Sequence, residues 1–130
     1  MSGGYSSVNG IKKTESVQRV VSKYKSEALM SALCVVRIYD GDAAPSIMNG
    51  SYDDAKAIGI AISSGKSIDV LMFGTIEDNF FSRFQVNDFL YLGPDSMPTN
   101  VVPSSGYFVR IGKYLGNNIA LIQVEPPILL

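Results

Sequence analysis

The chain has 130 residues, of which 46% are hydrophobic and 18% are charged, and its formal net charge is −1. This length and composition favour one domain with a buried core, and the near-neutral charge argues against a domain-wide nucleic-acid-binding surface. The sequence has no apolar run of about 18 residues, which a membrane-spanning helix needs, and residues 1–7 lack the basic and apolar regions of a signal peptide.

The first thirty residues differ in charge from the rest of the chain. Residues 1–11 are rich in Gly, Ser and Asn, a composition typical of a flexible terminus. Residues 1–30 carry five basic and two acidic side chains, a net charge of +3, whereas residues 31–130 carry six and ten, a net charge of −4. We therefore divide the chain into an N-terminal arm at 1–30 and a β-rich body at 31–130.

Residues 14–30 could form a short helix within this arm. Thr14 or Ser16 would cap it. Apolar side chains recur near the helical period at Val17, Val20, Val21, Tyr24, Ala28 and Leu29. The β-branched residues and serines weaken the helical pattern, so an extended arm is the alternative interpretation.

From residue 32 onward the sequence is typical of short strands separated by turns. We expect six or seven strands, six of them at residues 34–39, 57–62, 68–73, 89–92, 107–111 and 119–124. Short strands at this spacing indicate a compact β-barrel or sandwich of antiparallel strands. The predicted fold class is therefore mainly β, with an N-terminal arm or short helix.

Turn residues connect several of these strands. Asp40-Gly41 is expected to end the first strand, and the loop 63–67 to join the second and third strands in a β-hairpin. Gly116-Asn117-Asn118 is a strong hairpin signal before the last strand. The polar connection after the third strand holds an aromatic cluster of Phe80, Phe81 and Phe84.

The sequence offers little for catalysis. It contains no histidine, which excludes Ser-His-Asp and Cys-His catalytic groups, and a single cysteine, Cys34, argues against a zinc site. Cys34 lies in the apolar run 32–36, and we interpret it as a small buried hydrophobe in a reducing compartment. We therefore expect no enzyme activity, no catalytic residue, no cofactor and no metal.

Two segments look like parts of ligand sites but have the wrong spacing. A phosphate-binding loop has four residues between its first glycine and the Gly-Lys-Ser that ends it. In residues 59–67, five residues separate Gly59 from Gly65-Lys66-Ser67, and a strand is expected to follow in place of a helix. Asp40-Gly-Asp42 begins like a calcium-binding EF-hand loop, but its fifth and twelfth positions are Ala44 and Ser51. We interpret the first segment as a hairpin turn and these acidic residues as turn formers.

A carbohydrate site would use either paired acids or exposed aromatic rings. Glu77 and Asp78 are adjacent, so in a strand their side chains point to opposite faces and do not form a glycosidase pair. Stacking surfaces for a sugar could come from Tyr39, Tyr52, Tyr91, Tyr107 and Tyr114. In a small β-domain, however, tyrosines more often lie in the core or in subunit interfaces.

Several motifs in residues 34–130 occur in a characteristic order. Ala-Ile-Gly-Ile-Ala at 57–61 is followed by a strand that ends at Gly74, then Leu-Tyr-Leu-Gly at 90–93, Val-Arg-Ile-Gly at 109–112 and Pro-Ile-Leu-Leu at 127–130. With this order the chain resembles a small β-module of tailed-bacteriophage virion proteins, among head-decoration, head-fibre and tail-fibre components.

The resemblance implies a non-enzymatic virion structural protein, most closely a capsid decoration (cement) protein. Such a protein would bind the major capsid protein on the outer shell as a homotrimer and stabilise the shell, without nucleic-acid or membrane partners. It would be made in the bacterial host cytoplasm and end on the capsid surface. We expect the arm to dock on the capsid through Tyr5, Ile11, Lys12, Lys13 and Arg19. A tail-fibre, tail-tip or head-fibre adaptor and a carbohydrate-binding module are the alternatives.

Overall fold

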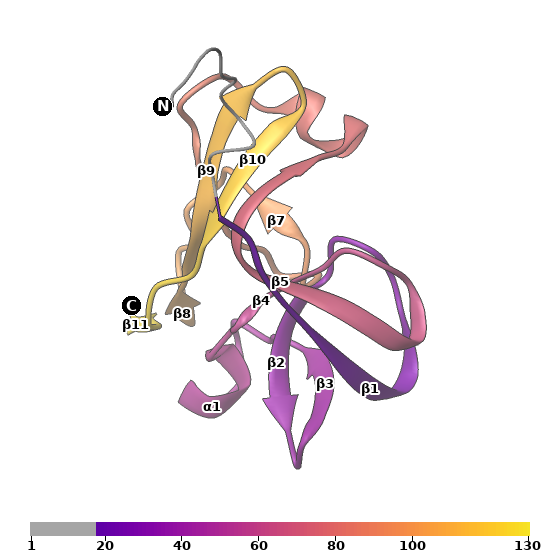
Figure 1. Ribbon diagram of the computed structural model, residues 1–130. Coiled ribbons are helices and arrows are strands. Elements are labelled where there is room, and N and C mark those ends of the chain that lie inside the picture. Colours follow the sequence, from indigo (N-terminus) through magenta and orange to yellow (C-terminus); the bar gives the residue numbers. More distant parts are fainter. Residues whose placement is uncertain (1–17) are drawn as a thin grey trace.

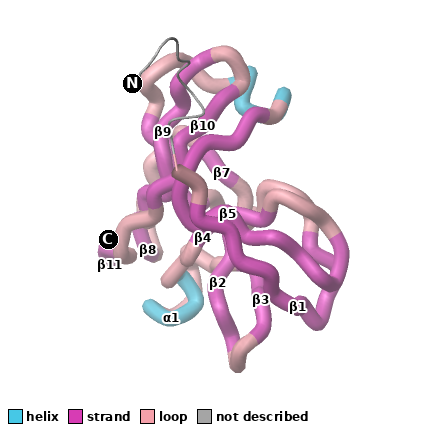
Figure 2. Tube along the Cα trace, in the orientation of Figure 1, coloured by secondary structure: helices cyan, strands magenta, loops and turns pink. Residues whose placement is uncertain are grey.

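A computed structural model describes residues 18–130, which are mainly β (Figure 1; Figure 2). In chain order the strands are β1 (Val20–Met30), β2 (Val35–Tyr39), β3 (Asp42–Pro45), β4 (Gly59–Ala61), β5 (Gly65–Glu77), β6 (Phe89–Leu92), β7 (Pro98–Thr99), β8 (Tyr107–Phe108), β9 (Arg110–Gly116), β10 (Ile119–Gln123) and β11 (Ile128–Leu129). The helices are one turn of α-helix, α1 (Tyr52–Ala55), and a 3-10 helix, η2 (Asn79–Arg83). The predicted mainly β class is confirmed.

Five of the strands close into a barrel, in the lower right of Figure 1. The barrel order is β1-β3-β2-β4-β5, and it closes because β1 also pairs with β5 in antiparallel register, from Val20 opposite Phe73 to Met30 opposite Gly65. The contact between β1 and β3 is parallel and short, with Ser26 opposite Ala43. One pairing of the barrel therefore departs from the antiparallel arrangement predicted.

The 13-residue strand β5 belongs to both halves of the fold. Its first part pairs with β1 and β4 in the barrel, and its last part, from Phe73 to Glu77, pairs with β10. From there the sheet continues in the order β10-β9-β6-β7, which we call the second sheet. The change of partner occurs at Gly74, whose φ of +126° suits glycine far better than any other residue.

Two apolar cores lie on the two sides of the wall that the barrel shares with the second sheet. The core inside the barrel is built from Met30, Cys34, Val36, Ala43, Ala61, Ile68 and Val70. Their neighbours Val35, Ile60 and Leu71 instead pack into the larger core, with residues from the second sheet such as Leu90 and Ile122. Adjacent residues of a strand face opposite sides, so one strand supplies both cores.

The predicted turns are confirmed. Asp40 and Gly41 have φ values of 52° and 84° between β2 and β3, and Asn117 and Asn118 have values of 54° and 64° between β9 and β10. Both pairs suit the two-residue hairpin turns in which both central residues have positive φ. β4 and β5 form the hairpin expected across residues 63–67, although β5 already begins at Gly65.

The strand predicted at residues 107–111 is divided in the structure. Tyr107–Phe108 form β8, which pairs with β11 in a separate two-stranded ribbon, whereas β9 begins at Arg110 and pairs with β6 and β10. The short strand β3 after the Asp40-Gly41 turn was not predicted.

The helix predicted within residues 14–30 is wrong for residues 20–30, which form β1. Ser22, Tyr24 and Ser26 are the less exposed positions in the middle of β1, a spacing of two that is typical of a strand. Because two of the three are serines, the apolar pattern of the sequence did not show this period. β1 is part of the barrel, so a boundary at residue 30 would cut through the body, and residues 14–17 lie outside the described part of the chain.

Candidate interaction surfaces

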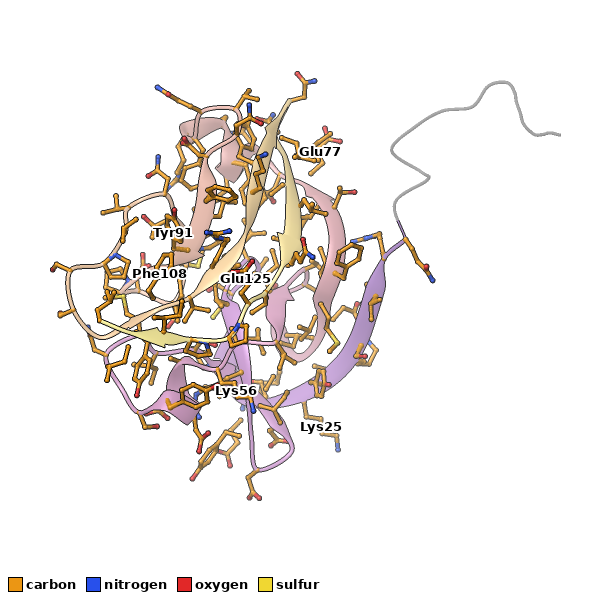
Figure 3. The ribbon with its side chains drawn as sticks, turned by 90° about the vertical axis from the view of Figure 1, so that its left-hand side faces the viewer. Lys25, Lys56, Glu77, Tyr91, Phe108 and Glu125 are labelled. Carbon is orange, nitrogen blue, oxygen red and sulfur yellow. The ribbon has the colours of Figure 1, made fainter. Side chains whose placement is uncertain are left out.

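The exposed side of the second sheet carries aromatic and basic side chains that lie close together. Phe89 of β6 is opposite Lys113 of β9, and Tyr91 of β6 is opposite Arg110 of β9. Directly opposite residues project from the same face of a sheet. The ring of Phe108 in β8 adjoins that of Tyr91, with 5.0 Å between centroids (Figure 3). We call these five residues the aromatic face.

Contacts within the aromatic face hold its side chains in place. The guanidinium carbon of Arg110 lies 4.2 Å from the centroid of the Phe89 ring, and Lys113 Nζ lies 5.7 Å from the same centroid. Such cation–π contacts contribute about 0.5–1 kcal/mol each at exposed sites. Arg110 also forms an ion pair with Glu125 at 3.7 Å. These contacts favour one arrangement of the side chains before any partner binds.

The aromatic face borders a shallow pocket of about 120 Å³, lined by Phe89, Arg110, Gly112, Lys113, Leu121, Gln123 and Glu125. Phe89 remains 42% exposed beside it. The Nε atom of Arg110 is buried and has no hydrogen-bond partner among the described residues. Phe89 is exposed and Tyr91 and Phe108 are half-buried, and aromatic residues combined with arginine are typical of the residues that dominate protein–protein interfaces.

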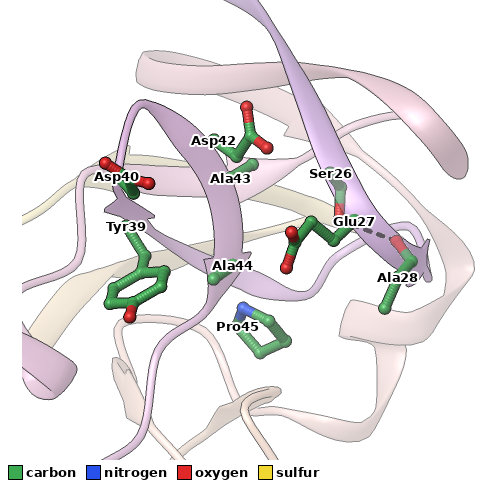
Figure 4. Close-up of a pocket in the computed structure, with 9 residues that line it drawn as sticks. All are labelled: Ser26, Glu27, Ala28, Tyr39, Asp40, Asp42, Ala43, Ala44 and Pro45. Carbon is green, nitrogen blue, oxygen red and sulfur yellow. Dashed lines mark hydrogen bonds between the residues drawn. The ribbon is translucent and has the colours of Figure 1, made fainter.

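A second surface is an acidic pocket of about 170 Å³ between the end of β1 and the β2–β3 hairpin (Figure 4). Its carboxylates come from Glu27 on β1 and from Asp40 and Asp42 at the hairpin turn. Tyr39 lines the same pocket and is 63% exposed. None of the nine lining residues is basic, and the nearest cation is Arg37, which donates a hydrogen bond of 3.1 Å to the Pro45 carbonyl and lies 5.2 Å from the centroid of the Tyr39 ring. Three carboxylates against this one guanidinium leave the pocket with a net negative charge at neutral pH. We call it the acidic pocket.

The acidic pocket is not a metal centre of a recognisable kind. Within residues 18–130, no group of three His, Cys, Asp or Glu side chains has the arrangement that could hold a metal ion. Residues 40–42 instead form a hairpin turn, as the sequence predicted, with Asp40 and Gly41 at its positive-φ positions.

Of the five residues predicted to dock on a capsid, Arg19 alone falls within the described residues. It is exposed, and it passes close to β5: a Cβ added to Gly74 would lie 2.9 Å from Arg19 Cγ. Arg19 thus lies at the junction between the barrel and the second sheet. Tyr5, Ile11, Lys12 and Lys13 lie outside the described residues.

Cys34 is buried inside the barrel, as predicted. Burial, with a smaller contribution from the negative charge of Asp95, raises the pKa of its thiol from 9.0 to about 11. The thiolate is the reactive form of cysteine. A buried thiol with a raised pKa is therefore a packing residue and a poor nucleophile.

Two acidic residues, Asp78 and Asp54, cap helices, whereas Glu77 of the rejected glycosidase pair is exposed. Asp78 caps η2, because its carboxylate accepts a hydrogen bond of 2.8 Å from the Phe80 N–H. Asp54 accepts a hydrogen bond of 3.0 Å from the Ser51 N–H in a reciprocal cap of α1, and this bond lowers the pKa of its carboxyl. Glu77 is the last residue of β5 and is exposed.

The five tyrosines do not gather around one groove. Tyr114 is buried and Tyr91 and Tyr107 are half-buried, whereas Tyr39 and Tyr52 are exposed. Tyr39 also borders an open groove of about 590 Å³, where Arg37, Asp53 and Lys56 are among the polar lining residues. Residues 59–67 comprise β4, the turn at 62–64 and the start of β5, with no helix after the turn, so they do not have the geometry of a phosphate-binding loop.

Tyr91 is the one member of the aromatic face that the sequence predicts as a candidate site residue. One signal was present: in Phe89-Leu-Tyr-Leu92 the leucines alternate with aromatic residues, and the structure buries Leu90 and Leu92 while leaving Phe89 exposed. Alternation alone does not say which set faces solvent, because both sets are hydrophobic.

Comparisons with protein-family models, with curated proteins and with solved structures find no match to this chain. No helix in the described part of the chain is long and apolar enough to cross a membrane.

Proposed function

We propose that this protein is a non-enzymatic virion structural protein of a tailed bacteriophage, and specifically a capsid decoration protein. It binds the major capsid protein on the outer shell as a homotrimer, after synthesis in the host cytoplasm. The observation that carries the proposal is the aromatic face on a mainly β body, where the exposed ring of Phe89 lies under Arg110 and Tyr91 packs against Phe108. Such a face suits stable contact with another protein.

The proposed protein stabilises the capsid by mass action. It binds the assembled shell and not the separated capsid subunits, so binding shifts the equilibrium toward the intact shell. The basic N-terminal segment, including Lys12, Lys13 and Arg19, makes the contact with the shell. Arg19 fits this role because it is exposed at the start of the body.

The first test is cryo-electron microscopy of the phage particle that contains the chain. Density for this β-body on the outer capsid surface, with residues 1–18 reaching neighbouring shell subunits, would support the proposal. Density at the tail or on a sparse fibre would overturn the capsid location and favour the adaptor function instead.

A binding assay then tests the N-terminal segment. A chain that lacks residues 1–18 keeps all of β1, so its body should fold and yet fail to bind assembled shells. Replacing Lys12 and Lys13 by glutamine in the full chain is the matched variant, and it should weaken binding through lost charge alone. Unchanged shell occupancy of the truncated chain would overturn the role of the segment.

Carbohydrate binding is a second candidate function, favoured by the exposed ring of Tyr39 beside the groove that holds Arg37, Asp53 and Lys56. An exposed ring can stack on the apolar face of a sugar while charged groups bind its hydroxyls. Glycan-array binding that survives removal of residues 1–18 and is lost in Tyr39→Ala would support it. Absence of array binding by the full chain would exclude it for the glycans tested.

A further inference from the structure

We infer that copies of this chain bind one another head to tail, with the aromatic face of one copy against the acidic pocket of the next. This inference rests on the proposed homotrimer and deepens it, because it names the two surfaces that meet. The occupant of the aromatic face is thus a second copy of this chain.

The first argument is the character of the aromatic face. Phe89 is 42% exposed, yet its ring is held under Arg110 at 4.2 Å. Aromatic residues and arginine are enriched in the energetically dominant parts of interfaces, since they bury much area at little cost in conformational entropy. Because Arg110 is already restrained by Phe89 and Glu125, little further ordering is needed on binding.

The second argument is charge complementarity. The aromatic face presents two cations, Arg110 and Lys113, near one carboxylate, that of Glu125. The acidic pocket presents three carboxylates, against the single guanidinium of Arg37 beside it. The basic surface of one copy attracts the acidic surface of another copy, whereas two basic surfaces or two acidic surfaces repel each other. Complementarity therefore favours a head-to-tail contact over a symmetric pairing of like faces.

The third argument is the placement of the two surfaces. In Figure 1 β8 and β9, which carry part of the aromatic face, lie on the left at middle and upper height, whereas the β2–β3 turn is at the lowest point of the molecule. The two sets of lining residues share no member. One copy can therefore use both surfaces at once, which a head-to-tail assembly requires, and such an assembly closes into a ring when the rotation between copies permits.

A charge exchange tests whether these two surfaces meet. Lys113→Glu on the aromatic face and Glu27→Lys at the acidic pocket are each made in the full chain, and self-association is measured by analytical ultracentrifugation. Each single change should weaken association by at least about tenfold, because it places like charges together. The double variant Lys113→Glu/Glu27→Lys should recover association to within about threefold of the natural chain.

Two exposed residues outside both surfaces supply matched controls, Lys66→Glu and Glu77→Lys. They make the same changes of charge and should leave association unchanged. Far-ultraviolet circular dichroism confirms that each variant is folded. A natural chain that stays monomeric at its highest soluble concentration would overturn the inference, as would single variants that associate normally or a double variant that shows no recovery.

Failure of this inference is distinguishable from failure of the proposed function. Shell binding is measured separately, with the same proteins and purified shells. Recovery in the double variant without shell binding would support the contact between copies and contradict the capsid function. Shell binding by a chain that is monomeric in solution would support the capsid function and overturn the head-to-tail contact.

Discussion

Gly74 is the residue at which the barrel meets the second sheet, and two separate constraints act on it. Its φ is +126°, and an added Cβ would lie 2.9 Å from Arg19 Cγ and 3.1 Å from Arg19 Cα. We expect Gly74→Ala to lower the free energy of unfolding by about 2–3 kcal/mol, through backbone strain and displacement of the segment before β1. Urea denaturation measures this loss.

Gly65 provides the matched control for that prediction. Its φ is +115°, but an added Cβ would meet no atom within 4 Å. Gly65→Ala should therefore cost about 1 kcal/mol, through backbone conformation alone. Equal losses for the two variants would mean that the Arg19 segment does not constrain Gly74.

Cys34 makes the stability of the fold depend on pH above 9. The thiol pKa is about 11 in the folded protein against an ordinary value of 9.0. Below pH 9 both states hold the proton, whereas between pH 9 and 11 the unfolded chain ionises first. The free energy of unfolding should thus fall across this range, by an amount on the order of 2 kcal/mol.

Urea denaturation of the natural chain and of Cys34→Ala at several pH values measures the effect. The variant removes the thiol and should lack the part of the pH dependence that the thiol causes. Parallel stability curves for the two proteins above pH 9 would contradict the raised pKa. In the folded natural chain, alkylation of the thiol at pH 8 should also be slow, because little thiolate is present.

At the scale of the element, the β9–β10 hairpin depends on two asparagines with positive φ. Asn118→Gly places glycine at the second turn position, where this turn type most favours it. The Asn118 N–H to Tyr114 hydroxyl bond and the Asn118 carbonyl to Asp78 N–H bond use backbone atoms and remain. We expect a gain of about 0.5–1 kcal/mol in unfolding free energy, and a loss of similar size for Asn118→Val.

Strand β1 should be indispensable to the fold, in contrast to the residues before it. It joins β5 to β3 and so closes the barrel around Ile68 and Val70. A chain lacking residues 1–18 should unfold cooperatively with near-natural stability, whereas one lacking residues 1–30 should lose most of the 5–15 kcal/mol typical of a domain. Circular dichroism during urea denaturation compares them, and equal midpoints would contradict the role of β1.

The sequence predicted those elements that are determined by residues close together in the chain. Asp40-Gly41 and Asn117-Asn118 form their turns because these residue types tolerate positive φ, and the apolar run around Cys34 is buried as its composition indicates. Closure of the barrel has no local cause, since it pairs residues that are 35 positions apart at Met30 and Gly65 and 53 apart at Val20 and Phe73. The small, polar side chain of Ser26 is buried in β1, which hid the strand from a search for apolar periodicity.

The candidate surfaces were harder to predict than the strands because several segments build each of them. The aromatic face joins β6, β8 and β9, and a register shift between Leu90 and Tyr91 brings Arg110 opposite Tyr91. The acidic pocket joins residues 26–28 to residues 39–45 through the short parallel contact of β1 with β3. Neither the register shift nor this parallel contact has a signature in the sequence.

At the scale of the whole molecule, the two proposals together predict how assembly controls attachment to the shell. If a trimer presents three N-terminal segments, binding of the first raises the effective concentration of the others, and affinity for the shell exceeds that of a single copy by about 100-fold or more. At a concentration where its weakened association leaves it monomeric, Lys113→Glu should therefore bind shells at least about 100-fold more weakly than the natural chain, although its N-terminal segment is intact. Co-sedimentation with purified shells measures both affinities, with Lys66→Glu as the control that keeps the trimer. Equal shell affinity of the monomeric variant and the natural chain would mean that one segment is sufficient and that assembly contributes nothing to attachment.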